Sequence, residues 1–135
     1  MESFGARIAA KLKAGDVVAL SGGLGAGKTT LARFVLEALG HTGEVPSPTF
    51  TIIEVYDGLS VPVVHADFYR LKSPAEADEI GLYEYREGAA LIAEWPENAG
   101  GFAHEAACLW IALEIADQGR RAIAEGGSDW LERMP

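Results

Sequence analysis

The chain has 135 residues with 49% hydrophobic and 23% charged side chains, a balance typical of one soluble globular domain, and no apolar run is long enough to span a membrane. Its formal net charge is −9, with 11 basic against 20 acidic side chains and no basic cluster, which argues against strong direct binding to RNA or DNA and favours a protein partner. A single cysteine, Cys108, excludes an internal disulfide or a zinc cluster, and with no targeting leader at the start we expect a cytoplasmic protein with one domain over residues 1–135.

The first predicted elements are a helix and a strand. Apolar side chains recur at helical spacing in residues Ser3 to Ala14, where Phe4, Ile8 and Leu12 share one face and Ser3 is placed to cap the N-terminus. Val17 to Leu20 follows as an apolar run of strand length. Core packing is a sufficient reason for the apolar face of this helix.

A glycine-rich turn follows this strand. Gly22 and Gly27-Lys28-Thr29 have the spacing of a P-loop, in which glycines let successive N–H groups face a phosphate chain and a helix N-terminus adds its dipole. Lys28 can then reach the β- and γ-phosphates, and the Thr29 hydroxyl can join the shell of a Mg²⁺ ion. The expected nucleotide-binding residues are Gly22, Leu24, Gly25, Ala26, Gly27, Lys28, Thr29 and Thr30.

The flanking sequence separates a phosphate site from a chance glycine-rich turn. A strand precedes the turn, and Leu31, Phe34, Val35 and Ala38 then recur at the spacing of one helix face. Gly40 is placed to end that helix. This context favours a site for ATP or GTP.

A stiff loop comes next, because Pro46 and Pro48 restrict themselves and their predecessors to extended backbone. It occupies the place where NTPases keep their first switch segment, and its Ser47 and Thr49 either contact the γ-phosphate or its Mg²⁺, or cap a turn. We expect strands over Thr49 to Tyr56 and Val61 to Ala66.

Acidic residues end two of the predicted strands. Asp67 follows the strand that ends at Ala66 in the Walker B arrangement, where a carboxylate orients Mg²⁺, although such an Asp can also cap the next turn. Glu94 ends a second apolar strand and is a further candidate to bind the metal or position water. Both would lie on the sheet edge that holds the P-loop, so Lys28, Asp67 and Glu94 are the candidate catalytic residues. His65 is expected to be structural.

The rest of the chain completes an α/β fold. Ser73-Pro74-Ala75-Glu76 opens a short helix, with Ser73 as N-cap, and Cys108 to Ile115 with Arg120 to Ala124 predicts an antiparallel hairpin. The tail, Ser128 to Pro135, is expected to be a short helix that docks through Trp130 and Leu131.

Four motifs together resemble the TsaE (YjeE) family of bacterial ATPases, which serve the synthesis of threonylcarbamoyladenosine in tRNA. The motifs are Leu24-Gly25-Ala26-Gly27-Lys28-Thr29-Thr30, Ser47-Pro48-Thr49-Phe50-Thr51, His65-Ala66-Asp67-Phe68-Tyr69-Arg70-Leu71 and Glu94-Trp95-Pro96. They occur in family order and spacing over nearly the whole chain. The chain departs from the family pattern at Gly23, where an Asp is usual.

The resemblance implies a P-loop NTPase-like three-layer fold, with a mixed sheet to which antiparallel strands are added. It implies that the P-loop holds ATP, that Thr29 and Glu94 bind Mg²⁺, that Asp67 takes the Walker B role, and that the loop through Ser47 and Thr49 acts as a switch. It also implies that the chain acts on a TsaD–TsaB pair, which would handle the tRNA, and hydrolyses ATP slowly when alone.

Three other classes compete with this interpretation. A free-standing small P-loop kinase usually carries a basic lid over the phosphates, for which Arg70 and Arg86 are the only mid-chain arginines. A GTPase needs a guanine-reading Asn-Lys-x-Asp motif, which the sequence lacks. A purely structural role leaves Asp67 and Glu94 unexplained.

Overall fold

A computed structural model describes residues 1–23, 26–48, 51–117 and 119–135. They form one six-stranded sheet with the strand order β2-β3-β4-β1-β5-β6. The strands are β1 (Val17–Ser21), β2 (Ile53–Tyr56), β3 (Val63–Asp67), β4 (Ala90–Glu94), β5 (Cys108–Ala116) and β6 (Gly119–Gly126). The helices are α1 (Glu2–Lys11), α2 (Lys28–Ala38), α3 (Ala75–Glu79) and α4 (Leu82–Arg86), with the 3₁₀ turns η1 (Pro96–Ala99) and η2 (Ser128–Trp130).

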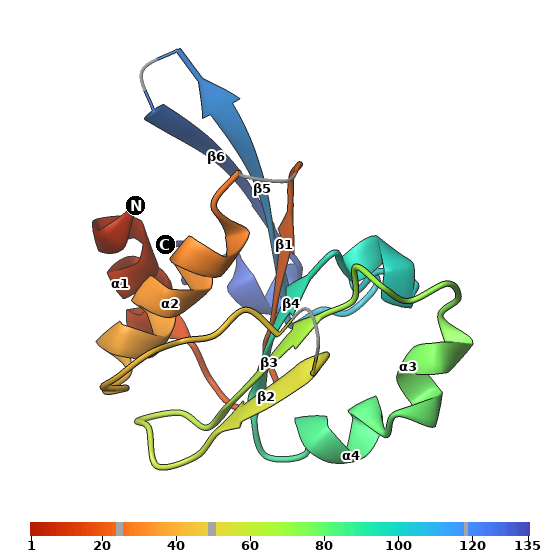
Figure 1. Ribbon diagram of the computed structural model, residues 1–135. Helices are drawn as coiled ribbons and strands as arrows, with labels where there is room; N and C mark the ends of the chain where they lie inside the picture. The colour runs from red at the N-terminus through yellow and green to blue at the C-terminus, as the bar shows by residue number, and fades with distance from the viewer. Residues whose placement is uncertain (24–25, 49–50, 118) are drawn as a thin grey trace.

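The sheet is mixed, as predicted. Strands β3, β4, β1 and β5 run parallel, whereas β2 pairs antiparallel with β3 at one edge and β6 pairs antiparallel with β5 at the other. Helices α1 and α2 cover one face and α3, α4 and η1 lie on the other, which gives three layers (Figure 1). The predicted α/β class with added antiparallel strands is therefore confirmed.

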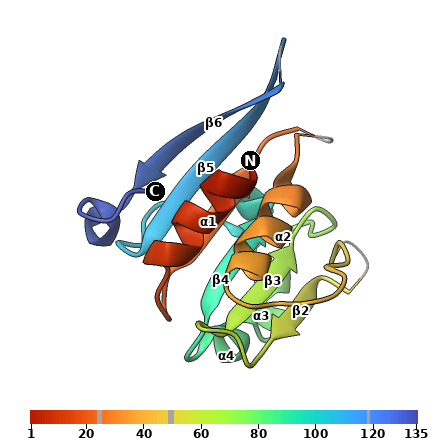
Figure 2. The same ribbon diagram turned by 90° about the vertical axis from the view of Figure 1, so that its left-hand side faces the viewer.

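The strands feed two separate apolar clusters, because successive side chains of a strand point to opposite faces. In β1, Val18 and Leu20 pack beneath α1 and α2, whereas Val17 and Ala19 pack with residues of α3 and α4. Helices α1 and α2 lie side by side (Figure 2). They approach closely at Gly5, where an added Cβ would lie 2.7 Å from the Phe34 Cβ.

The helix that follows the glycine-rich turn ends as the sequence predicts. Gly40 has a φ of +111°, and its N–H donates to the Glu37 carbonyl while the His41 N–H donates to the Leu36 carbonyl. These two bonds form a Schellman motif, which satisfies carbonyls left free at the helix end.

The N-terminal helix differs from its prediction at both ends. It begins at Glu2, so Ser3 lies inside the first turn, where its Oγ accepts a hydrogen bond from Arg7 instead of capping the helix. It ends at Lys11 rather than Ala14. The predicted Ser73 cap is also wrong, because Pro74 is the N-cap of α3 and no side chain caps that helix.

The tail docks through one of the two residues predicted to do so. Trp130 is fully buried and donates from Nε1 to the Ala107 carbonyl, whereas Leu131 is 69% exposed. Arg133 lies over the Trp130 ring and makes a two-pronged ion pair with Asp16, with both N···O distances at 2.6 Å. This pair ties the end of the described chain to the start of β1.

We expect Arg133→Met to lower the free energy of unfolding by about 3 kcal/mol, because it leaves the Asp16 carboxylate, which is 3% exposed, without its cation. Arg121→Met is the matched control, since its ion pair with Glu114 is exposed and should contribute less than about 1 kcal/mol. Urea unfolding of both variants measures the difference. Equal losses would contradict the conclusion that the Arg133–Asp16 ion pair holds the tail against the start of β1.

Candidate functional site

The glycine-rich turn needs glycine for two different reasons. Gly22 has a φ of +140°, and a Cβ there would lie 2.5 Å from the Leu113 carbonyl oxygen. Gly27 has a φ of +101° and is the N-cap of α2. The predicted residues Leu24 and Gly25 lie outside the described part of the chain, while Ala26 is buried under the turn.

Lys28 folds back onto its own loop. Its Nζ donates to the carbonyl oxygens of Gly22 at 2.8 Å and Gly23 at 2.9 Å, and it lies 4.6 Å from the centre of the Trp95 ring. Burial lowers the pKa of Lys28, while the negative charges of Glu94, Asp67 and Glu97 oppose that shift. The ammonium group is thus partly desolvated at the place where a P-loop lysine meets phosphate.

The structure brings the other predicted site residues together at the ends of β3 and β4. The Thr29 Oγ1 donates to the Glu94 carboxylate, with distances of 2.9 and 3.0 Å to its two oxygens. Asp67 is aligned with Glu94 across the parallel pair β3–β4, and the two are 5% and 3% exposed. Thr30 lies in the first turn of α2, beside Thr29.

These oxygens suit Mg²⁺, a hard cation that commonly binds one or two protein oxygens while phosphates and water complete its shell. Two buried carboxylates side by side repel each other, so a cation between them would relieve that repulsion. A cage of three or more His, Cys, Asp or Glu side chains does not occur among the described residues. Thr29 and Glu94 remain candidate ligands, and so does Asp67, whose Oδ1 also accepts a hydrogen bond from the Tyr69 N–H at 2.9 Å, the turn-capping role that the sequence left open.

A histidine that sequence reasoning treated as structural also reaches this cluster. His65 is fully buried on β3, and its Nε2 lies 2.6 Å from the Glu94 Oε2. Strand alternation indicates that His65 and Asp67 share a face of the sheet, because they are two residues apart, but it does not indicate the contact with Glu94.

Two residues with unusual backbone flank the site. Trp95 follows Glu94 directly with a φ of +54°, and its ring packs 5.0 Å from that of Tyr69 while also covering Lys28. Ile52 has a φ of +68°, which a β-branched residue rarely adopts. Such conformations cost about 1–3 kcal/mol and concentrate at functional sites.

Backbone hydrogen bonds through Ile52 connect the predicted switch segment to the end of β3. The Ile52 N–H donates to the Pro48 carbonyl at 2.6 Å, and the Ile52 carbonyl accepts from the Asp67 N–H at 2.9 Å. This turn starts β2 at Ile53, so the strand predicted from Thr49 is shorter than expected. Ser47 is exposed, and Thr49 lies outside the described residues.

Two arginines have defined surroundings in the structure. Arg86, a candidate for a basic lid, is instead paired with Glu105 at 2.6 Å and lies over the Phe102 ring. Arg120 lies close to Gly27 and lines a cavity of about 380 Å³ with Met1, Phe4, Arg7, Leu113 and Ala122. A cavity with both apolar and arginine walls thus adjoins the glycine-rich turn.

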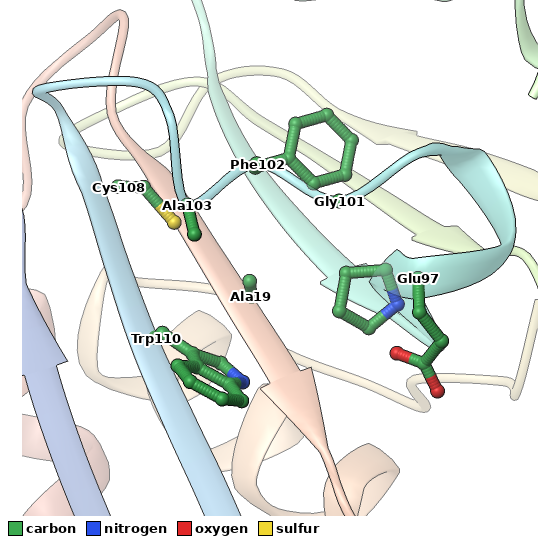
Figure 3. A pocket seen from close by; sticks show the side chains of 8 residues that line it. Ala19, Glu97, Gly101, Phe102, Ala103, Cys108 and Trp110 are labelled. Atoms are coloured by element: carbon green, nitrogen blue, oxygen red, sulfur yellow. The ribbon is translucent and has the colours of Figure 1, made fainter.

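A second cavity, of about 140 Å³, lies on the opposite face of β1 between η1 and β5 (Figure 3). Phe102, Ala103, Cys108 and Trp110 line it, and Glu97 is the one charged side chain among the described residues of its lining. Since none of the described residues that line it is a lysine or arginine, this cavity does not suit the triphosphate. The cavity borders β1 at Ala19, and Trp110 from its wall donates through Nε1 to the Ser21 Oγ of that strand at 2.8 Å.

The sheet order and the glycine-rich strand-to-helix turn define a P-loop NTPase-like α/β fold. The chain belongs to the TsaE family, because the family model described as threonylcarbamoyl adenosine biosynthesis protein TsaE matches residues 1–123. No helix in the described ranges is long and apolar enough to cross a membrane.

Individual proteins show the same similarity. The chain is 39% identical to the tRNA threonylcarbamoyladenosine biosynthesis protein TsaE of Haemophilus influenzae over 77% of this chain and 66% of that protein. It is 47% identical to the Bacillus subtilis protein of that name over 64% of this chain and 54% of that protein. The match thus spans about half to two thirds of these relatives. The crystal structure of Bacillus subtilis YdiB superposes with a TM-score of 0.77 at 32% identity, covering 96% of this chain and 80% of the other.

Cys108 offers a test of the packing behind the P-loop. Burial raises the pKa of its thiol to about 11, and the nearby Glu105 adds to this effect. At pH 8 we expect native Cys108 to react with a disulfide reagent at least about 100-fold more slowly than in the urea-unfolded chain, since it is the thiolate that reacts.

The pH dependence has a definite sign. The native rate should keep rising between pH 9 and 11 as the thiol ionises, whereas the unfolded rate levels off near its ordinary pKa of about 9. Equal rates at pH 8 would contradict the buried placement of Cys108.

Proposed function

We propose that this chain binds and hydrolyses ATP with Mg²⁺, and that it acts on a TsaD–TsaB pair in the threonylcarbamoyladenosine modification of tRNA. The observation that carries the proposal is the contact of Thr29 with Glu94, beside Asp67 and Lys28. It joins the hydroxyl of the P-loop motif to the carboxylate at a strand end, which is the donor set of a Mg²⁺–triphosphate site.

Each of these residues has a defined task in the proposal. Lys28 exchanges its bonds with the Gly22 and Gly23 carbonyls for the phosphates, which restores anionic partners to a desolvated charge. Thr29, Glu94 and Asp67 would hold Mg²⁺, which when bound supplies positive charge at the phosphates. In this proposal the nucleoside would occupy the cavity beside Gly27, where Phe4 offers an apolar surface and Arg120 a planar cation.

We expect slow turnover by the isolated chain. Phosphoryl transfer depends on positive charge near the transferred group, and an arginine supplied in trans can raise the rate by roughly 10³–10⁵. The Arg86 guanidinium is already paired with Glu105 at 2.6 Å. A partner protein is therefore the proposed source of further stabilisation.

The charge of the chain agrees with an indirect role in tRNA modification. With a net charge of −9, the surface repels the phosphate backbone, so tRNA is handled by the partners in this proposal. The names of the relatives assign those proteins to tRNA threonylcarbamoyladenosine biosynthesis. We extend that pathway to this chain on the basis of its membership of the family.

The decisive experiment measures ATP hydrolysis by the purified chain, alone and with a TsaD–TsaB pair, with Lys28→Ala as the matched blank. We expect the pair to stimulate hydrolysis at least tenfold, because it would complete the charge stabilisation, and we expect the variant to lose the stimulated rate. Unchanged hydrolysis with the pair would reject the partnership and direct attention to a small-molecule kinase with its own acceptor. Normal turnover by Lys28→Ala would reject the P-loop assignment itself.

Tryptophan fluorescence provides a direct readout of phosphate entry. Because the Lys28 Nζ lies 4.6 Å from the Trp95 ring, drawing the ammonium group toward phosphate should change the emission of this residue. We expect ATP with Mg²⁺ to alter the emission of the wild type and to leave Trp95→Phe unaffected. Trp110→Phe, which keeps Trp95, is the control and should retain the signal. A response that survives in Trp95→Phe would show that another tryptophan reports binding.

A further inference from the structure

The most deeply buried polar side chain at the candidate site is not one of its expected ligands. His65 is fully buried in β3, and its Nε2 lies 2.6 Å from the Glu94 Oε2. Its other ring nitrogen, Nδ1, has no hydrogen-bond partner within the described ranges. The ring therefore makes one polar contact, and that contact is with a carboxylate that also binds Thr29.

The contact favours one ring nitrogen as the carrier of the hydrogen. An ionised carboxylate only accepts hydrogen bonds, so Nε2 must be the donor. A hydrogen on Nδ1 would be a buried donor without a partner, which costs more than an unused lone pair. These two arguments assign a hydrogen to Nε2, aimed at Glu94.

The sheet register explains why these two residues meet. His65 is aligned with Ile92 on β4, so Glu94 is its diagonal neighbour, two residues further along the same face. Long side chains reach such diagonal neighbours across a strand pair. Glu94 is therefore approached from two directions, by Thr29 from the start of α2 and by His65 from within the sheet.

We propose that His65 is a positioning residue, whose Nε2–H holds the Glu94 carboxylate in the orientation that binds Mg²⁺ beside a nucleotide. The inference rests on the proposed function, since it gives Glu94 the task assigned there. It adds a residue behind the predicted ligands. Removing such a supporting hydrogen bond typically lowers the affinity of the site for its metal about 10- to 100-fold, because the ligand is no longer pre-oriented.

Two amide substitutions separate positioning from packing. In His65→Gln the amide nitrogen can occupy nearly the place of Nε2, whereas in His65→Asn the same amide is one methylene too short to reach Glu94. We would titrate the non-hydrolysable analogue adenosine 5′-(β,γ-imido)triphosphate by calorimetry, with Mg²⁺ and with EDTA. The quantity compared is the factor by which Mg²⁺ tightens binding of the analogue.

We expect His65→Asn to reduce this Mg²⁺ factor about 10- to 100-fold while the affinity in EDTA changes less than about threefold. His65→Gln should retain the factor to within about threefold. In a Glu94→Gln background, His65→Asn should have little further effect, because the histidine acts through that carboxylate. An unchanged Mg²⁺ factor in His65→Asn, or equal losses in EDTA and Mg²⁺, would overturn the proposal.

The wild type supplies a measurement that does not depend on a folded variant. A long-range proton–nitrogen NMR spectrum of the chain, which has 3 histidines, should show His65 with its hydrogen on Nε2 and slow exchange of that hydrogen. A hydrogen on Nδ1 alone would overturn the proposal. If the wild type itself binds no analogue under either condition, the proposed function fails, a result distinct from normal Mg²⁺ coupling in His65→Asn.

Discussion

The burial of the Glu94 carboxylate is the constraint on which the rest of this site depends. A charge that is 3% exposed is costly unless it is paired and hydrogen-bonded. Thr29 and His65 supply the hydrogen bonds, and Lys28 supplies an opposite charge nearby. Since these partners come from the first turn of α2 and from β3, one side chain ties the P-loop helix to two strands of the sheet.

The strand order makes this convergence possible. Because β4 lies between β1 and β3, Glu94 at the end of β4 is aligned with Leu20 of β1 on one side and with Asp67 of β3 on the other. All three strands run in the same direction, so their carboxyl ends meet at one edge of the sheet. Open α/β sheets bind their ligands at this edge.

Much of this could be predicted from the sequence, because local patterns determine much of it. The glycine spacing, the strand-ending acids and the Schellman glycine each depend on a few neighbouring residues, and the structure brings Lys28, Thr29, Asp67 and Glu94 together. The predictions were wrong where tertiary contacts determine the exposure of a side chain or the start of a strand. Leu131 is exposed because Trp130 and Arg133 already hold the tail, and β2 starts late because Ile52 turns to bond Pro48 and Asp67.

His65 illustrates the limit of such pattern analysis. A lone histidine in an apolar strand looks like a core residue, and its burial agrees with that. Its contact with Glu94 requires the register of β3 against β4, which joins residues that are 29 positions apart in the chain. No local pattern specifies that register.

The charges of the site also imply that the binding of nucleotide and the binding of metal depend on each other. A triphosphate at the loop would meet Lys28 and the dipole of α2, but also the buried carboxylates of Asp67 and Glu94. Without a cation, these carboxylates repel the γ-phosphate. A divalent cation between them reverses the sign of that interaction. Binding of nucleotide and of metal should therefore be mutually reinforcing at this site, because each supplies the charge that the other lacks.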